Sequence, residues 1–423
     1  MTALALDAED PVLDAAHRRM RARAREVAPA LREAALAIDA DPSRMDDHLD
    51  NPAFRLFRAM GIPERFQDER YRAEVKGLPR DFLAQMICSM ELARGDAGAM
   101  FAGPAPALAG VVVRTLGDER QQAAFYERVA DGATWAFCAI TEPQAGSDAT
   151  RMQTALTPAD PADRSGDWLL SGAKKYVGNG SRGGVGVVFA QTGNSPLSVR
   201  AALLELPAPG AHGEALDMIG LRGARISEMT FREVPIARDR LLGAHLPATR
   251  RGMWGAVTAF YGARVQISAT AVGLAAAVYD YVRAERRTPA PAAERRVLET
   301  AALRIAAAAR LVHRTALLVE ADQGRGDASA LCKLEAVRLA GDVTRRLPAL
   351  LGRGALLDHP LLEKWVRDAA ALELMEGTSD IQRLRLAQDY ARSGAVPAGS
   401  DPVPAVGDGV PVVGDVVPAG EGG

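Results

Sequence analysis

Glu376 is the carboxylate whose surroundings in the sequence best suit proton transfer. It lies between an apolar stretch that ends at Met375 and the helix-breaking Gly377. Partial burial in such a setting raises the pKa of a carboxyl group and makes its carboxylate a better proton acceptor. Thr378 or Ser379 could then cap the helix that follows. A surface-loop glutamate without a chemical role is the alternative on the residues alone.

A second segment with chemical potential runs from Ala139 to Asp148 and directly follows a β-prone run. Thr141, Gly146 and Ser147 offer hydroxyl groups or exposed backbone donors that could bind carbonyl or phosphate oxygens. A tight turn in which Ser147 and Asp148 hydrogen-bond to their own backbone explains the same residues. Both interpretations remain open at this point.

Other patterns do not indicate a chemical site. The glycine-rich run 180–186 would need a helix after it to bind a dinucleotide, but β-prone Val185–Gln191 follows, so we predict a β-hairpin turn. The six histidines form no HxxxH pair, and Cys88, Cys138 and Cys332 lie far apart. We therefore predict no metal site and a reducing compartment.

The bulk composition indicates a globular enzyme of more than one packed unit. The chain has 423 residues, 48% of them hydrophobic and 25% charged, with a formal net charge of -2. Because the chain lacks the excess of basic residues that is typical of nucleic-acid binding, we expect no nucleic-acid partner. The acidic start lacks the features of a secretory signal, and we found no uninterrupted strongly apolar run of 18 residues. We expect a cytoplasmic protein without a membrane partner.

These residues must be positioned by helices, then strands, then helices, an order that predicts segregated layers of an α+β fold. Helical periodicity covers Pro11 to about Gly132, and it returns from Met253. We predict an N-terminal α-helical domain at 1–133, a middle β domain at 134–243 and a C-terminal α-helical bundle at 244–392. The tail 393–423 has no Lys or Arg and is rich in Gly and Pro, so we expect it to be disordered and its removal to be harmless.

Periodicity and turn residues give finer expectations within these parts. A small β barrel or sandwich is expected from β-prone runs at Trp135–Thr141, Trp168–Leu170, Tyr176–Val177, Val185–Gln191, Ala201–Leu206 and Met229–Val234. Turns are expected at Pro158–Asp163, Gly193–Pro196 and Pro207–Gly213. A seam of apolar residues from Leu298 to Val319, at steps of four and three, predicts the core of the bundle.

Several motifs together resemble those of the acyl-CoA dehydrogenase family, in the same order and spacing, over roughly residues 15–392. The run 141–148 (TEPQAGSD) is similar to the first signature of that family, and 172–179 (GAKKYVGN) resembles its G-x-K-x-W-I-T-N strand. The run 219–227 (IGLRGARIS) with 231–235 (FREVP) resembles the stretch that closes its middle domain. Residues 376–383 (EGTSDIQR), with Arg367-Asp368 before them, resemble its C-terminal signature.

This resemblance implies a helical N-domain, a β barrel or sandwich and a C-terminal four-helix bundle. It implies FAD at their junction and between the subunits of a homodimer or homotetramer. It also implies that Glu376 removes the α-proton of an acyl thioester while the β-hydrogen leaves as a hydride to flavin N5. The cofactor-binding residues that it implies are Ile140, Thr141, Gly146, Ser147, Tyr176, Gly178, Arg286, Gly352 and Thr378. The substrate-binding residues that it implies are Ser147, Tyr261, Arg264 and Gly377.

The departures from the family pattern bear on the partners. Gly178 replaces the hydroxyl residue that usually reaches the flavin, so the electron acceptor stays open between an electron-transfer flavoprotein and oxygen. The runs 286–290 and 348–354 match the cross-subunit FAD elements only loosely. The runs 174–179 and 220–227 resemble dehydrogenases of polyketide and peptide antibiotic pathways. We therefore expect an acyl group on a carrier protein rather than on CoA.

Two other functions remain as alternatives on this fold. The first is a flavin-dependent oxidase or monooxygenase, although such monooxygenases commonly lack the glutamate that Glu376 matches. The second is a non-catalytic, degenerate relative that serves as a binding subunit.

Overall fold

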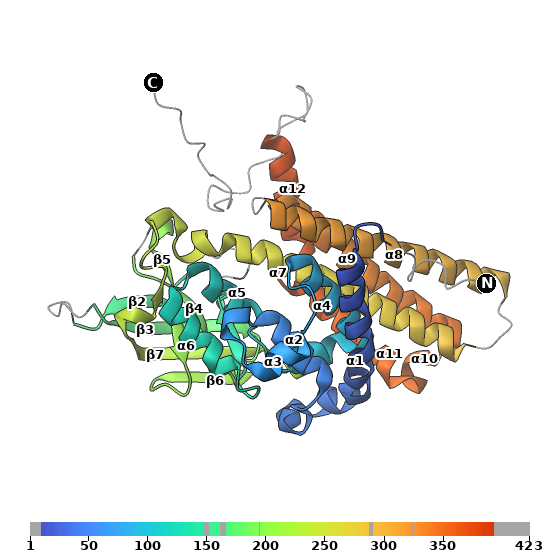
Figure 1. The fold of residues 1–423 in the computed structure, drawn as a ribbon, viewed down its shortest axis with the longest axis horizontal. Coiled ribbons are helices and arrows are strands. Elements are labelled where there is room, and N and C mark those ends of the chain that lie inside the picture. The colour runs from blue at the N-terminus through green and yellow to red at the C-terminus, as the bar shows by residue number, and fades with distance from the viewer. Residues whose placement is uncertain are drawn as a thin grey trace.

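The computed structural model describes residues 10–144, 146, 152–160, 166–193, 195–286, 291–322 and 325–392. Helices form the first and last parts of the chain, and strands form the part between them (Figure 1). The expected α+β class is confirmed. The predicted disordered tail, residues 393–423, lies outside the described residues.

The helices are α1 (Ala15–Ala40), α2 (Pro52–Gly61), α3 (Glu69–Glu74), α4 (Phe82–Ala102), α5 (Ala107–Leu116), α6 (Glu119–Val129), α7 (Gly252–Glu285), α8 (Ala292–Ala321), α9 (Gly326–Arg346), α10 (Ala355–Asp358), α11 (Pro360–Leu374) and α12 (Ser379–Arg392). The strands are β1 (Ala136–Ala139), β2 (Ala155–Pro158), β3 (Trp168–Val177), β4 (Val185–Gln191), β5 (Val199–Glu205), β6 (Ala211–Ala215), β7 (Ser227–Ile236) and β8 (Leu241–Leu242).

Aspartates fix the starts of three N-terminal helices. Asp14, Asp81 and Asp118 each accept a hydrogen bond from a backbone N–H in the first turn of α1, α4 and α6. Asp118 forms a full capping box with Gln121. Each bond satisfies a donor that the helix itself leaves unpaired.

Helix α7 is the centre of the helical core. It crosses the molecule from the sheet to the far end and packs against α4, α8 and α9 (Figure 1). The helix is long and apolar enough to span a membrane, but 83% of its most apolar 18-residue window is buried inside the molecule. Such extensive burial is typical of a helix in the centre of a protein core. The seam on α8 is also buried, at Leu298, Ile305 and Val312 among others, so its prediction as bundle core is confirmed.

The strands form one mixed sheet in the order β6-β7-β3-β2-β4-β5-β8, with β1 parallel to β4. Strand β4 shows how the sheet separates two cores. Val187 and Phe189 pack into the helical core, whereas Val188 and Ala190 pack into a smaller core within the strands. Because successive side chains of a strand point to opposite faces, β4 must be apolar from Val185 to Ala190, as its sequence is.

The structure corrects several expectations for the strands. The runs 168–170 and 176–177 belong to one strand, β3, whose register with β7 shifts twice between them. Strands β2, β6 and β8 were not expected, and β6 occupies part of the predicted turn 207–213. Strands β3 and β4 are not hydrogen-bonded neighbours, so the run 180–186 is a connection and not a hairpin turn. Short, partly exposed strands such as β6 lack the apolar alternation that identifies a strand.

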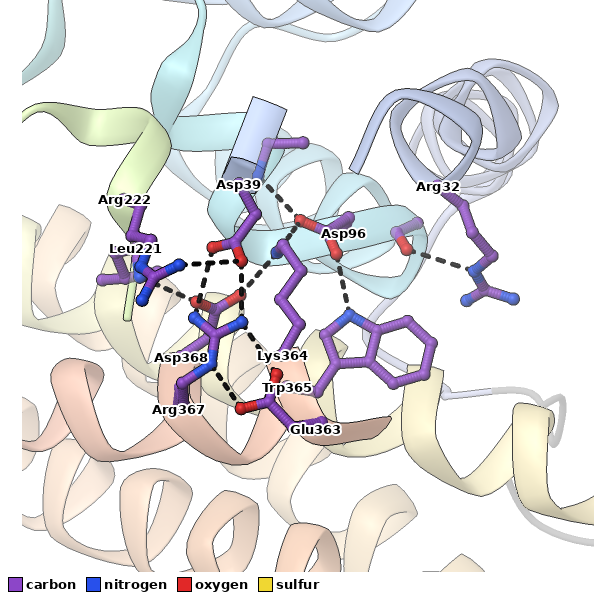
Figure 2. A network of polar contacts seen from close by, with 12 residues as sticks. Arg32, Asp39, Asp96, Leu221, Arg222, Glu363, Lys364, Trp365, Arg367 and Asp368 are labelled. Carbon is purple, nitrogen blue, oxygen red and sulfur yellow. Dashed lines mark hydrogen bonds and ion pairs between the residues drawn. The ribbon is translucent and has the colours of Figure 1, made fainter. Parts of the chain in front are cut away.

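A buried polar network joins α4 and α11 to the segment that follows β6 (Figure 2). Lys364 Nζ lies 2.7 Å from Asp96 Oδ1 and 2.7 Å from Asp368 Oδ2. Trp365 Nε1 donates to Asp96, and the backbone N–H of Leu221 donates to Asp368. Asp96 has extended backbone angles that interrupt α4, which turns its carboxylate toward α11.

Candidate active site

Glu376 lies in the tight turn between α11 and α12. Its φ is +52° and that of Gly377 is +90°, so two consecutive residues are left-handed. Thr378 accepts a hydrogen bond at 3.4 Å from the Ile381 N–H, and it is the N-cap of α12, as predicted. Ser379 instead starts the helix, and its N–H donates to the Glu373 carboxylate at 2.9 Å. Both ends of the turn are therefore held by polar groups.

Two basic side chains bear on the Glu376 carboxylate and on its turn. Arg264 on α7 is only 5% exposed and donates from Nε to the Glu376 carbonyl at 3.3 Å. Lys333 on α9 is fully buried and donates to the Gly377 carbonyl at 2.5 Å. Burial lowers the pKa of Arg264 to about 10 and that of Lys333 to about 8.

The Glu376 carboxyl itself is poised for proton transfer. The residue keeps some exposed surface, yet burial of its carboxyl raises the pKa of Glu376 despite the opposing charges of Arg264 and Lys333. Because desolvation outweighs these charges, the carboxylate is a stronger proton acceptor than an exposed one. The interpretation of Glu376 as a solvated loop residue does not fit this position.

The segment that leaves β1 is fixed by a buried ion pair. Lys174 Nζ, on β3, donates to the Ile140 carbonyl at 2.9 Å and to Glu142 Oε1 at 3.0 Å. Glu142 also accepts from the backbone N–H of Gln153 and Thr154, at 2.6 and 2.8 Å. Burial acts to raise the pKa of Glu142, but these hydrogen bonds and the Lys174 charge lower it below its usual value. The carboxylate therefore stays ionised, while Lys174 and the Lys175 N–H hold the carbonyls of Ile140 and Thr141 in place.

The two segments singled out by their chemistry meet in space. Cys138, two residues before Ile140, has a pKa raised first by burial and further by the charge of Glu376. The Cys138 thiol and the Glu376 carboxyl are therefore within range of a direct charge interaction. The site thus lies where the end of β1 faces the turn between α11 and α12.

The residues expected to bind FAD offer an exposed ring and open backbone. Tyr176 has a φ of +61° and its side chain is 60% exposed. Among the described residues, a Cβ atom added at Gly146 would meet nothing within 4 Å, and one at Gly178 would meet only Ile226, at 4.0 Å. An aromatic face beside accessible backbone fits a large planar cofactor such as the isoalloxazine ring.

Buried nitrogen atoms without a hydrogen-bond partner are also available to bind a ligand. Arg264 Nη1 is buried without a hydrogen-bond partner among the described residues, although the Arg264 guanidinium lies 5.3 Å from the Tyr261 ring centre. Arg286 has two such nitrogens, Nε and Nη1, and its nearest carboxylate is that of Glu294 at 3.7 Å. Buried donors without acceptors are rare in folded proteins, so these nitrogens are available to a bound group.

Arg286 and Gly352 lie away from the other predicted residues. Arg286 follows Arg264 by 22 positions on the line of α7, which corresponds to about 33 Å along a helix. Gly352, with a φ of +117°, follows the 3₁₀ turn Leu347–Leu351 after the end of α9. Within one chain these two residues do not join the site around Glu376. Ser147 lies outside the described residues.

Comparison with known proteins identifies the family. The model of the acyl-CoA dehydrogenase middle domain matches residues 137–234, and that of the C-terminal domain matches residues 250–391. The acryloyl-CoA reductase (NADH) of Anaerotignum propionicum is 31% identical over 288 residues, which are 65% of this chain and 71% of that protein. The chain belongs to the acyl-CoA dehydrogenase family. It is therefore an FAD-dependent oxidoreductase of that type.

Other members of the acyl-CoA dehydrogenase family show similar coverage. The human mitochondrial short-chain specific acyl-CoA dehydrogenase is 28% identical over 356 residues, 79% of this chain and 80% of that protein. Butyryl-CoA dehydrogenase from Megasphaera elsdenii superposes with a TM-score of 0.75 at 22% identity, over 91% of this chain and all of that chain. A prolyl acyl carrier protein oxidase gives a TM-score of 0.74 at 21% identity, over 90% of this chain. The two structural likenesses show the fold.

Three buried residues that hold the site in this acyl-CoA dehydrogenase family member were not predicted to have a role. They are Lys174, Lys333 and Gln382, all fully buried. The signal for Lys333 was available, because it lies on the apolar stripe of α9 with Ala330, Ala336 and Val337. A lysine at such a position must find buried partners.

Proposed function

We propose that this protein oxidises the Cα–Cβ bond of an acyl thioester, with Glu376 as the base that removes the α-proton. The observation that carries the proposal is the Glu376 carboxyl, desolvated yet flanked by Arg264 and Lys333 at the point where β1 meets the α11–α12 turn. A base in this position must be ionised at working pH and poorly solvated. The raised pKa and the nearby cations supply these two properties together.

Backbone and side-chain donors would stabilise the charge that develops on the thioester oxygen. No described residue accepts a hydrogen bond from the backbone N–H of Glu376, so this group is available for a carbonyl oxygen. Arg264 Nη1 is a second free donor in the same region. Such preorganised donors each contribute about 3–4 kcal/mol to transition-state stabilisation in other enzymes.

Thr141, Tyr176, Gly178 and Thr378 are the residues of this site that would hold FAD. When bound, FAD would accept the hydride from the β-carbon at N5. The backbone N–H of Lys175 donates to the Thr141 carbonyl at 2.8 Å, and the exposed Tyr176 ring would exclude water from one side.

We propose that Arg286 and Gly352 serve the cofactor of a second copy of the chain. The support is their distance from Glu376 and the two buried nitrogens of Arg286 that have no hydrogen-bond partner among the described residues. A homodimer or homotetramer would bring them to the FAD of a neighbour. We also propose domain limits at 1–133, 134–243 and 244–392, which place all the strands in the middle domain.

We further propose that the acyl group is carried by a protein in a biosynthetic pathway. The support is the resemblance of the runs 174–179 and 220–227 to dehydrogenases of that type. The relatives named for CoA thioesters make CoA the alternative carrier. The electron acceptor is either an electron-transfer flavoprotein or oxygen.

An anaerobic titration of the purified flavoprotein tests the activity. Short-chain acyl groups are presented both on CoA and on a carrier protein. We expect bleaching of the oxidised flavin by at least one thioester, with a lower concentration needed for the carrier-bound form. Reoxidation with an electron-transfer flavoprotein or with oxygen then identifies the acceptor. Absence of bleaching by the whole panel would overturn the proposal, and protein that stays colourless with FAD would favour a non-catalytic role.

A further inference from the structure

The turn that carries Glu376 has a backbone conformation that needs external support. Glu376 and Gly377 are both left-handed, and for a glutamate this conformation is unfavourable. Such residues persist only where the surroundings determine their conformation. The groups that hold the turn therefore also determine where the Glu376 carboxylate lies.

Three buried side chains from three helices hold two consecutive carbonyls of this turn. Arg264 on α7 and Gln382 on α12 donate to the Glu376 carbonyl, at 3.3 and 3.1 Å. Gln382 also donates to the Gly377 carbonyl at 3.2 Å. Lys333 on α9 donates to the same Gly377 carbonyl at 2.5 Å and to the Glu373 carbonyl at 2.8 Å.

Lys333 is the member of this group whose presence packing alone does not explain. Its side chain is 0% exposed, and both of its hydrogen bonds go to backbone carbonyls. In the described part of the chain no carboxylate lies within ion-pair distance of its Nζ. A buried cation without a contacting counter-ion is costly, and an apolar residue of similar size would avoid that cost.

The charged residues around Lys333 indicate that its ammonium group interacts electrostatically with the Glu376 carboxylate. Glu373 on α11 and Glu376 in the turn stabilise the positive charge from a distance, whereas Arg264 on α7 opposes it. The interaction is mutual, because Lys333 lowers the free energy of the ionised Glu376 carboxylate. The ammonium thus holds the turn and supplies a positive charge to the base.

We propose that Lys333 is a positioning residue for the Glu376 base: it fixes the Glu376–Gly377 turn through the Gly377 carbonyl and brings a positive charge near the carboxylate. The proposal rests on the function proposed above. The hydrogen bond and the charge can be tested separately, because Gln382 also donates to the Gly377 carbonyl but carries no charge.

The test measures the protonation of the Glu376 carboxyl group in the absence of substrate. The holoenzyme is labelled with 13C-glutamate and titrated with acid and base, and the infrared band of the Glu376 carboxyl is isolated by subtracting Glu376→Gln. Lys333→Gln, which removes the charge but keeps a donor, should raise the pKa of Glu376 by about 1 unit, as expected for loss of a nearby cation. Lys333→Arg should restore the wild-type value.

Two further variants serve as comparisons. Gln382→Leu should leave the titration of Glu376 unchanged but slow flavin reduction by thioester at least 10-fold, because the turn is less well held. Arg338→Gln, on the exposed side of α9, should change neither property.

An unchanged titration in Lys333→Gln, matching Arg338→Gln, would overturn the proposal. So would a shift that Lys333→Arg fails to reverse. If Lys333→Gln does not fold, a lowered reduction rate in Lys333→Arg with a wild-type Glu376 titration supports the proposal, and a shifted titration overturns it. Since the titration needs no substrate, failure of the proposed activity would be seen separately, as wild-type flavin that no thioester bleaches.

Discussion

At the scale of the residue, the chemistry depends on a carboxyl group that is partly desolvated but not isolated. Burial raises the pKa of Glu376, and Arg264 and Lys333 limit that rise. The apolar residues before Glu376 and the glycine after it predicted this setting. The buried cations could not be predicted in the same way, because α7 and α9 reach the site from more than 40 positions away in the sequence.

From the raised pKa of Glu376 we predict how the stability of the folded protein depends on pH. A group whose pKa is higher in the folded state favours folding below its unfolded pKa of about 4.3, and this contribution is lost as the pH rises through the folded-state value. Glu376→Gln should therefore unfold at a higher temperature than wild type at pH 8, and the difference should disappear near pH 4. Thermal unfolding across this pH range measures it. Glu299→Gln, on the exposed surface of α8, is the control. A difference that is constant with pH would contradict the assignment of the shift to Glu376.

At the scale of the element, the buried ion pair of Lys174 with Glu142 connects β3 to the segment after β1. Both residues stand within motifs that resemble the family, so their positions could be predicted from the sequence. Their pairing could not, because it depends on the order of strands in the sheet. The pattern of apolar residues identifies β4 and the core of β3, but it does not reveal that β3 and β4 are separated by β2. Sheet order is set by packing between distant parts of the chain.

Lys174→Met should uncouple these two elements. The substitution leaves the Glu142 carboxylate buried without its cation, which typically costs about 3–5 kcal/mol of unfolding free energy. We expect that loss in urea unfolding, together with a lower ratio of flavin to protein after purification. Lys175→Met is the matched control, since Lys175 pairs with Glu228 near the surface at 3.4 Å and should contribute less than about 1 kcal/mol. Equal effects of the two substitutions would contradict the account of the ion pair.

At the scale of the whole molecule, the network around Lys364 ties the helical parts to the segment that leads into β7. Asp96 on α4 and Asp368 on α11 share the Lys364 ammonium, and Leu221 joins through its backbone (Figure 2). Arg367 extends the network to Asp39 on α1, at 2.7 Å. The order of helices, strands and helices could be predicted from periodicity. These long-range polar contacts could not, because their partners lie up to 328 positions apart.

Lys364→Met should therefore weaken the joint between these parts. Two buried carboxylates would lose their common cation, and we expect a loss of about 3–5 kcal/mol in the free energy of unfolding. Arg383→Ala removes an exposed pair with Asp380 and should change stability by less than about 1 kcal/mol. Denaturant unfolding of both variants compares them. A Lys364→Met protein as stable as Arg383→Ala would show that the network does not hold the parts together.

The central claim is that Glu376 removes the α-proton, and anaerobic stopped-flow reduction of Glu376→Gln tests it most directly. The flavin absorbance at mixing shows whether FAD is still bound, and its decay on addition of the best thioester gives the rate. We predict a variant that retains FAD and is reduced at least about 100-fold more slowly than wild type, as expected for loss of a catalytic base. Reduction at the wild-type rate by the same thioester would contradict the account.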